Sequence, residues 1–390
     1  MNDRSDRASI LRPPTPTLRC ALGKAKCFLA AVLFVFATSS FAEAAGGYLP
    51  LWEKRPPNIT DLALIYQGSA QRPQWTRQRY APYVSYRDPR DGQEQWLFDG
   101  FLFIEFEDGR GHAFQARPHV RPAQKAHWLA LLEKNFAPDD GIPNLERICR
   151  DTAARIGPPQ RRRQIIITLP EASNSQTNWG EINGHPLDFR KTADRLAATD
   201  WYLNLVLQKW KKFAPQQLNL AGFYWGYESA PIDQFVKEAA QLVHTHGKQF
   251  FWIPYWHLPP VKGKQANWHS LGFDAAWQQP NHFFHPEIPD TRLDEACAFA
   301  KEHGMGLEME CNGRMLDKPK DFERRFDVYL DAFMQHGVKD ASSIAYYEDG
   351  GTLFRLANSH ESQMRAHYDR IAQFIVDRQK LADERRRQSH

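Results

Sequence analysis

The chain has few of the residues and motifs on which several common chemistries depend. Its 390 residues include five cysteines, none of them in a Cys-x-x-Cys pair, and Cys20 and Cys27 lie in an N-terminal leader. A disulfide framework or a cysteine metal site is therefore not expected. No Gly-x-Ser-x-Gly motif occurs, which argues against a nucleophilic serine. No glycine-rich phosphate loop follows the first apolar run, and we expect no cofactor.

The chain also lacks a strong excess of one charge. It has 50 Lys and Arg against 46 Asp and Glu, and residues 1–44 hold six of the basic and three of the acidic groups. This leaves 44 basic and 43 acidic groups in the remainder. Nucleic-acid binding needs a concentrated basic surface, so a nucleic-acid partner is not expected.

A long hydrophobic run occurs near the N-terminus. Basic residues between Arg12 and Lys26 precede the apolar run Cys27 to Ala37, and small residues follow as far as Ala44. This layout predicts a signal peptide at 1–44 and export to the periplasm or the exterior. The apolar run is short for a membrane span, so no stable membrane insertion is expected after cleavage, with an uncleaved anchor as the alternative.

Eight short apolar runs follow, mostly with helical patterns between them. This alternation predicts an α/β fold, a (β/α)₈ TIM barrel, with an open doubly wound sheet as the alternative. The runs are 62–66, 96–103, 164–169, 218–227, 249–255, 272–277, 306–311 and 343–348. The helical patterns are 122–136, 143–156, 189–213, 231–247, 291–303, 320–336 and 359–385.

No internal repeat or low-complexity linker divides the barrel region. We therefore predict an N-terminal segment at 45–58 and a single domain at 59–390. The second run continues through Ile104 to Phe106 into the turn Asp108-Gly109-Arg110-Gly111. This pattern predicts a hairpin or long loop inserted after the second strand.

Acids and aromatics gather where the predicted strands end. In a barrel the active site lies at the C-terminal ends of the strands, so these positions are candidate site residues. A high content of aromatics, 12 Trp, 13 Tyr and 25 Phe, suits a carbohydrate cleft. The candidates are Tyr66, Asp99, Tyr224, Glu228, Tyr255, Trp256, His257, Asp274, Gln279, Asn281, Glu308, Glu310, Tyr347 and Glu348.

Two of these acids form the predicted catalytic pair. Glycoside hydrolysis needs one carboxyl to protonate the leaving oxygen and another to attack or to activate water. Glu228 follows Trp225 and Tyr227, and an apolar setting favours its role as general acid. Glu308 and Glu310 share one strand face, and Glu310 is nearer the rim, so we predict Glu310 as the nucleophile and Glu308 as a deeper orienting acid.

The remaining candidates are predicted to bind substrate. Asp99, Asp274 and Glu348 would hold sugar hydroxyls or orient an acid, with a strand-end cap as the alternative for each. Trp256 and Tyr347 would stack on sugar rings, with core packing as the alternative.

A metal site is not predicted. His282-x-x-His285-Pro-Glu287 brings ligand types together. It lacks the helical His-Glu-x-x-His order and any obvious further ligand.

In combination, several motifs resemble an uncharacterised family of secreted bacterial barrels, described as a domain of unknown function. They are Leu97-Phe98-Asp99-Gly100-Phe101-Leu102, Gly222-Phe223-Tyr224-Trp225-x-x-Glu228, Trp252-Ile253-Pro254-Tyr255, Gly272-Phe273-Asp274 with Gln279-Pro280-Asn281, and Glu308-Met309-Glu310. The resemblance spans about 60–350 and implies a glycoside-hydrolase-like TIM barrel. More distantly, acids on strands four and seven are similar to a large clan of retaining glycosidases. The chain departs from that clan at Tyr227, where Asn is usual.

Two functional hypotheses follow. The first is an exported glycoside hydrolase that cleaves a polysaccharide or glycan with two carboxylates, by a retaining mechanism. The alternative is a non-catalytic glycan-binding barrel for envelope polysaccharide production or export.

Overall fold

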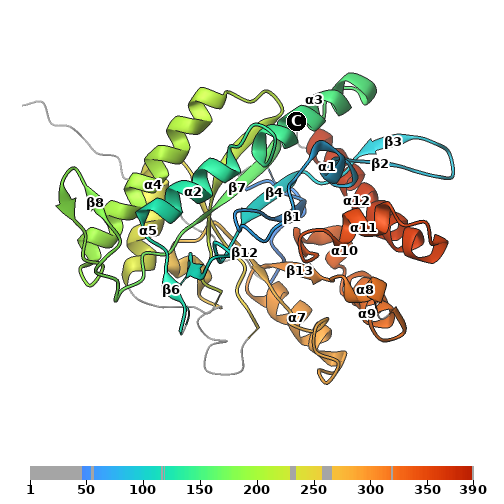
Figure 1. The fold of residues 1–390 in the computed structure, drawn as a ribbon. Coiled ribbons are helices and arrows are strands. Elements are labelled where there is room, and N and C mark those ends of the chain that lie inside the picture. The colour runs from blue at the N-terminus through green and yellow to red at the C-terminus, as the bar shows by residue number, and fades with distance from the viewer. Residues whose placement is uncertain are drawn as a thin grey trace, which may run out of the picture. The chain divides into compact units, whose positions relative to one another are not determined.

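The computed structural model closes eight parallel strands into a barrel, which confirms the predicted (β/α)₈ class (Figure 1). Each strand pairs with the next one along the chain, and the last pairs with the first. The strands are β1 (Asp61–Tyr66), β4 (Gly100–Ile104), β7 (Arg163–Leu169), β10 (Leu218–Trp225), β11 (Gln249–Trp252), β12 (Ala275–Gln278), β13 (Gly306–Glu310) and β14 (Ile344–Tyr347). The structure describes residues 46–53, 57–115, 117, 119–228, 234–256, 266–317 and 319–388.

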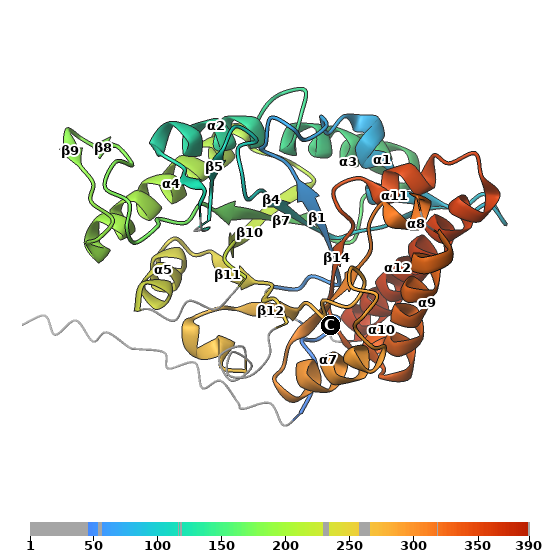
Figure 2. The ribbon, with the colours of Figure 1, turned by 60° about the horizontal axis from the view of Figure 1, so that its bottom comes forward.

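Helices surround the ring of strands (Figure 2). The larger ones are α2 (Lys125–Asn135), α3 (Ile142–Ile156), α4 (Thr192–Phe213), α5 (Gln234–Thr245), α7 (Thr291–Glu302), α9 (Pro319–Gln335) and α12 (Ser362–Gln388). The shorter ones are α1 (Arg77–Val84), η1 (Trp268–Leu271), α8 (Arg314–Asp317), α10 (Val338–Ala341) and α11 (Thr352–Ala357). No helical pattern was predicted where α1 lies, because its Arg, Gln and Pro residues carry no clear apolar period.

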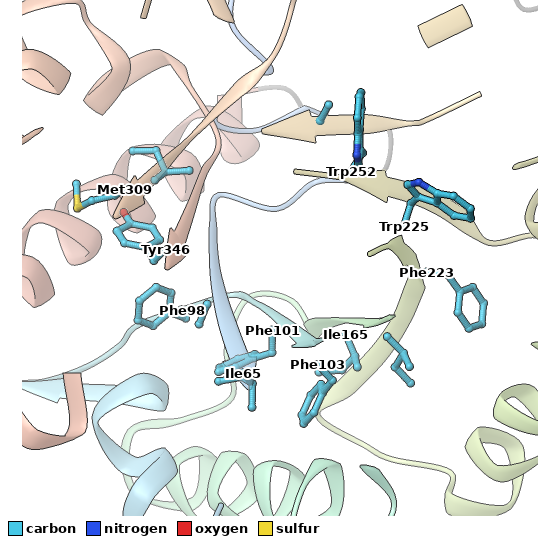
Figure 3. Close-up of a cluster of buried hydrophobic side chains, with 14 of the residues drawn as sticks. Ile65, Phe98, Phe101, Phe103, Ile165, Phe223, Trp225, Trp252, Met309 and Tyr346 are labelled. Carbon is cyan, nitrogen blue, oxygen red and sulfur yellow. The ribbon is translucent and has the colours of Figure 1, made fainter. Parts of the chain in front are cut away.

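Alternation along the strands separates two cores. Phe223 and Trp225 lie on the outer side of β10, where the Trp225 ring packs 6.0 Å from Phe235 of α5 (Figure 3). Tyr224, between them, belongs to the second core inside the barrel, together with Leu102 and Ile166. This period of two is what a strand between a helix layer and a barrel interior requires.

Two strands begin at least three residues later than predicted. The second barrel strand starts at Gly100, because β3 (Glu94–Trp96) pairs instead with β2 (Ser85–Arg87) in an antiparallel hairpin. The sixth starts at Ala275 rather than at Gly272. Asp99 and Asp274 therefore precede their strands and lie at the N-terminal end of the barrel.

An insertion follows β4, as predicted. It contains an isolated bridge between Glu107 and Ala113 and the short pair β5 (His112–Ala113) and β6 (Arg121–Pro122). A second hairpin, β8 (Glu181–Ile182) with β9 (His185–Pro186), follows β7 and was not predicted.

A buried polar cluster joins α12 to the N-terminal end of the barrel. Arg378 is fully buried, and its Nε donates to Asp61 at 2.7 Å. The same guanidinium donates to the carbonyls of Thr60 and Ser342 at 2.9 and 2.8 Å. The hydroxyl of Tyr346 also donates to Asp61, at 2.7 Å. Each of these hydrogen bonds replaces one that water would otherwise make to the buried charge of Asp61 or Arg378.

The predicted signal peptide at 1–44 lies outside the described residues. Residues 44–390 form one unit of the chain. Within the described ranges, no helix combines the length and the apolar composition that crossing a membrane requires.

Gly222 on β10 sits at a register shift and touches the neighbouring strand. A Cβ at this position would lie 2.0 Å from the carbonyl oxygen of Gln249. Gly222→Ala is therefore expected to lower the free energy of unfolding by about 1–3 kcal/mol, measured by urea denaturation. Gly47→Ala is the control, since no atom lies within 4 Å of its Cβ. Equal denaturation midpoints for the two variants would contradict this close approach.

Candidate active site

A cavity of about 300 Å³ opens among the C-terminal ends of the strands. Its size is at the lower end of the range of about 300–1,000 Å³ for small-molecule sites. Eight of the predicted site residues line it, and they come from six of the eight strands or the loops that follow them. They are Tyr66, Tyr224, Glu228, Tyr255, Gln279, Asn281, Glu308 and Tyr347.

Glu228 follows β10 and is partly buried at the cavity wall. Its backbone carbonyl accepts the Tyr255 amide at 3.2 Å, which joins the ends of β10 and β11. Burial raises the pKa of the Glu228 carboxyl to about 7, against the opposing effects of a hydrogen bond from Gln279 and the charge of Arg117. A carboxyl with this pKa can donate and accept a proton near neutral pH.

Glu308 lies within β13, is 2% exposed and opens on the same cavity. Among the described residues, none donates a hydrogen bond to its carboxyl. Burial raises its pKa well above the usual value, and the charges of Glu310 and Glu228 add to this effect. Two carboxyls in one enclosed site resist simultaneous ionisation. The charges of Glu228, Glu308 and Glu310 therefore oppose one another's ionisation in this part of the barrel.

Glu310 shares the face of Glu308 but does not line the cavity. Its two carboxylate oxygens accept the backbone N–H groups of Asn281 at 2.9 Å and His282 at 3.0 Å. The hydroxyl of Tyr329 on α9 also donates to it, and the side chain is fully buried. Glu310, predicted as the nucleophile near the rim, is not among the cavity-lining residues, because the loop after β12 folds over it. Glu310 holds this loop, which carries Gln279 and Asn281.

Asp99 and Asp274 lie at the opposite end of the barrel from the cavity, so neither faces the site. Asp99 accepts the backbone N–H groups of Thr60 and Asp61 at 2.9–3.1 Å and forms an ion pair with Arg161. Asp274 accepts the backbone N–H of Phe250 at 2.7 Å. Each carboxylate accepts backbone N–H groups at the N-terminal ends of neighbouring strands. This corresponds to the strand-end cap that was the alternative for both residues.

Glu348 and Trp256 follow their strands but turn away from the cavity. Glu348 accepts the backbone N–H groups of Gly351 at 2.8 Å and Leu353 at 3.0 Å, at the start of α11. Trp256 is 7% exposed and packs edge-on against Phe299 of α7. Both have the structural role that was the alternative to substrate contact. His257, also a predicted site residue, lies outside the described residues.

The other residues that line the cavity were not predicted. They are Leu64, Arg72, Ile104, Phe106, Arg117 and Phe284. Arg72 lies 4.5 Å over the Tyr66 ring and is held by Glu105 at 3.1 Å. Arg117 lies 5.6 Å from the Phe106 ring. Both arginines are in loops, where no strand period indicates which side chains face the site.

Aromatic rings form much of the cavity wall. Tyr347 meets Tyr66 edge-on at 5.7 Å and Phe284 edge-on at 5.2 Å. Tyr66 also meets Phe106 edge-on at 6.1 Å. These contacts fix the ring orientations, and rings with polar hydroxyls provide both flat apolar faces and hydrogen-bonding groups.

One cluster of metal-ligand types occurs among the described residues. Atoms of Asp108, His112 and His127 lie within 4.8 Å of one another in the insertion after β4 and at the start of α2. However, Nδ1 of His127 accepts the Gln124 amide at 3.0 Å, so in the neutral ring the proton is on Nε2, which faces Asp108. This nitrogen then has no lone pair for a metal, and the arrangement does not fit a metal site.

The histidines of the His282 motif pair with separate acids. Nε2 of His282 contacts Asp290 at 2.9 Å, and Nδ1 of His285 contacts Glu287 at 3.1 Å. The two imidazoles therefore do not form a shared ligand set in this part of the chain.

The fold and the cavity define a (β/α)₈ barrel with an acidic, tyrosine-rich site at the C-terminal strand ends. The sequence profile of the family described as Domain of unknown function (DUF4855) matches residues 61–373. The chain belongs to this family, as the motif resemblance predicted. No significant match was found among curated proteins.

Solved structures give a weaker comparison. A mutant tryptophan synthase α-subunit from Pyrococcus furiosus aligns with 7% identity, a TM-score of 0.38, and coverage of 81% of this chain and 97% of that chain. A chain from a structure of the Pyrococcus furiosus tryptophan synthase α2β2 complex aligns with 8% identity, a TM-score of 0.37 and the same coverage. Likeness at this level carries no information on function.

Proposed function

We propose that this protein is an exported glycoside hydrolase in which Glu228 is the general acid/base. The second carboxylate is Glu308 rather than Glu310. The proposal rests mainly on the observation that Glu228 and Glu308 line the same cavity. The carboxylate of Glu310 instead accepts hydrogen bonds from backbone N–H groups and from the hydroxyl of Tyr329.

The chemistry follows from these two positions. Glu228 donates its proton to the glycosidic oxygen as the bond to the anomeric carbon breaks, and the leaving sugar departs with that proton. The Glu308 carboxylate attacks the anomeric carbon to form a glycosyl-enzyme. Glu228 then removes a proton from a water molecule whose oxygen attacks the anomeric carbon, and the bond from that carbon to Glu308 breaks. A separation of about 5–5.5 Å between the carboxyls is the arrangement for this retaining course.

The pKa of Glu228 predicts how activity changes with pH. Burial raises this pKa from 4.5 to about 7, so the protonated acid is the main form below pH 7 and is lost above it. We expect kcat/KM to fall tenfold per pH unit above about pH 7, because the leaving oxygen then lacks its proton donor. A pH–rate profile tests this, and activity that rises steadily from pH 6 to 9 would contradict the acid role.

One observation favours a non-catalytic glycan-binding barrel instead. Burial and the charges of Glu310 and Glu228 raise the pKa of Glu308 well above its usual value, which favours the protonated carboxyl; that form binds sugar hydroxyls but does not attack carbon. In that case the tyrosines and both glutamates would hold a glycan without cleaving it.

A hydrolysis screen distinguishes the two functions. Bacterial exopolysaccharides and plant glycans are incubated with the protein, and released reducing ends and retained glycan are both measured. Hydrolysis that disappears in Glu228→Gln and Glu308→Gln supports the enzyme. A glycan that binds and persists uncleaved supports the binding barrel.

A further inference from the structure

A second cavity, of about 260 Å³, lies at the N-terminal end of the barrel. Arg163, the first residue of β7, lines it, so it is at the opposite end from the candidate active site. Trp96 from β3, Arg161 from the preceding loop and Lys380 from α12 also line it.

Arg163 is buried in this cavity and, among the described residues, forms no side-chain hydrogen bond or ion pair. Its side chain lies 4.7 Å from the Trp96 ring and the residue is 4% exposed. In the part of the chain that the structure describes, no residue accepts a hydrogen bond from its guanidinium, and Nε has neither a partner nor solvent. Burial lowers its pKa to about 10, which still leaves it charged at neutral pH. A buried charge without a counter-charge is strongly unfavourable.

The neighbouring acids form no ion pair with Arg163 among the described residues, although the charge of Asp383 acts on its pKa. Glu94 is held by Arg155 at 2.6 Å, and Asp383 is held by Arg386 at 2.9 Å. Arg161 is likewise neutralised, by Asp99. Lys380, which is exposed at the cavity, has no ion-pair partner among the described residues. Positive charge is therefore in excess at this cavity.

We propose that this cavity binds an oxyanion, a phosphate, sulfate or carboxylate group, with Arg163 as its main ligand. The planar guanidinium offers parallel N–H donors that match two oxygens of such a group. The Trp96 ring fixes the plane of the guanidinium, and Lys380 adds a second positive charge. The proposal concerns a separate site and does not depend on the proposed hydrolase activity.

Two sources can supply this chemistry, a free inorganic oxyanion or the acid group of a sugar. Sodium phosphate, sodium sulfate and sodium galacturonate are therefore titrated separately by calorimetry, with sodium chloride at matched ionic strength as the reference. Thermal unfolding is measured in parallel. We expect at least one oxyanion to bind and to raise Tm by about 2–4 °C. A response to phosphate or sulfate alone identifies an inorganic source, and a response to galacturonate identifies the acidic sugar.

Amino-acid substitutions test which side chain binds the oxyanion. Arg163→Gln is expected to weaken oxyanion binding by at least about tenfold, through loss of the charged hydrogen bonds. Without an oxyanion, its Tm should equal or exceed that of the parent, because an unpaired buried charge is removed. Lys380→Gln, at an exposed position, should weaken binding less. Arg150→Gln, on the exposed surface of α3, is the matched control and should bind as the parent does.

Two results would overturn the proposal. One is the absence of any oxyanion effect beyond that of chloride. The other is an oxyanion response in Arg163→Gln that equals the response of the parent and of Arg150→Gln.

Discussion

Glu308→Gln is expected to reduce kcat for glycan hydrolysis by about 10⁴–10⁶-fold, because the group that attacks the anomeric carbon is removed. Glu228→Gln is expected to reduce it by about 10²–10⁴-fold, because the leaving oxygen is no longer protonated. Initial rates on a glycan found in the hydrolysis screen measure both effects.

The matched control is Glu310→Gln, another buried glutamate two residues along β13. Because Glu310 does not line the cavity, its variant should keep kcat within about tenfold of the parent. It should lose about 2–4 kcal/mol of stability, since the N–H groups of Asn281 and His282 lose a charged acceptor. A complete loss of activity in Glu310→Gln with unchanged stability would return the catalytic role to Glu310.

A dinitrophenyl glycoside separates the roles of the two cavity acids. Its leaving group departs without protonation, so Glu228→Gln should hydrolyse it far better than it hydrolyses the glycan. Glu308→Gln should be inactive on both substrates. If Glu228→Gln is equally impaired on both, the acid role assigned to Glu228 is wrong.

Arg378→Met is expected to lower the free energy of unfolding by about 3–5 kcal/mol. The substitution leaves Asp61 charged and buried, and it removes the donor shared by the Thr60 and Ser342 carbonyls. Urea denaturation at neutral pH measures the change. The further substitution Asp61→Asn should restore part of the loss, because it removes the isolated charge.

Arg370→Met on the same helix is the control. Its ion pair with Asp327 is exposed, with side chains 46% and 43% accessible, and such pairs contribute about 0–1 kcal/mol. Equal losses for Arg370→Met and Arg378→Met would show that the buried cluster contributes no more than a surface pair.

The barrel could be predicted because its strands and helices carry different hydrophobic periods. Phe223, Tyr224 and Trp225 alternate between the outer and inner cores, as the period of a strand requires. Strand starts were less predictable. The run from Trp96 to Phe103 contains Asp99 as its only charged residue, and pairing of Trp96 with Ser85 is a tertiary contact that the run does not encode.

The candidate site could also be predicted only in part, because tertiary contacts decide which side chains reach the cavity. Strand parity indicated that Glu308 and Glu310 share a face, but depth along the strand suggested Glu310 as the acid at the site. The structure reverses this order because residues 281–283 fold over Glu310, a contact between segments almost 30 residues apart. Arg72 and Arg117 lie in loops and have no periodic signal.

The insertion after β4 has a consequence for how this family can diversify. The two glutamates of the cavity stand on or directly after barrel strands, whereas Phe106 and Arg117 come from the inserted segment. Loops accept changes in length and sequence at little cost to the scaffold. Under the proposed function, relatives could therefore exchange this segment and accept a different glycan while keeping the same pair of carboxyls.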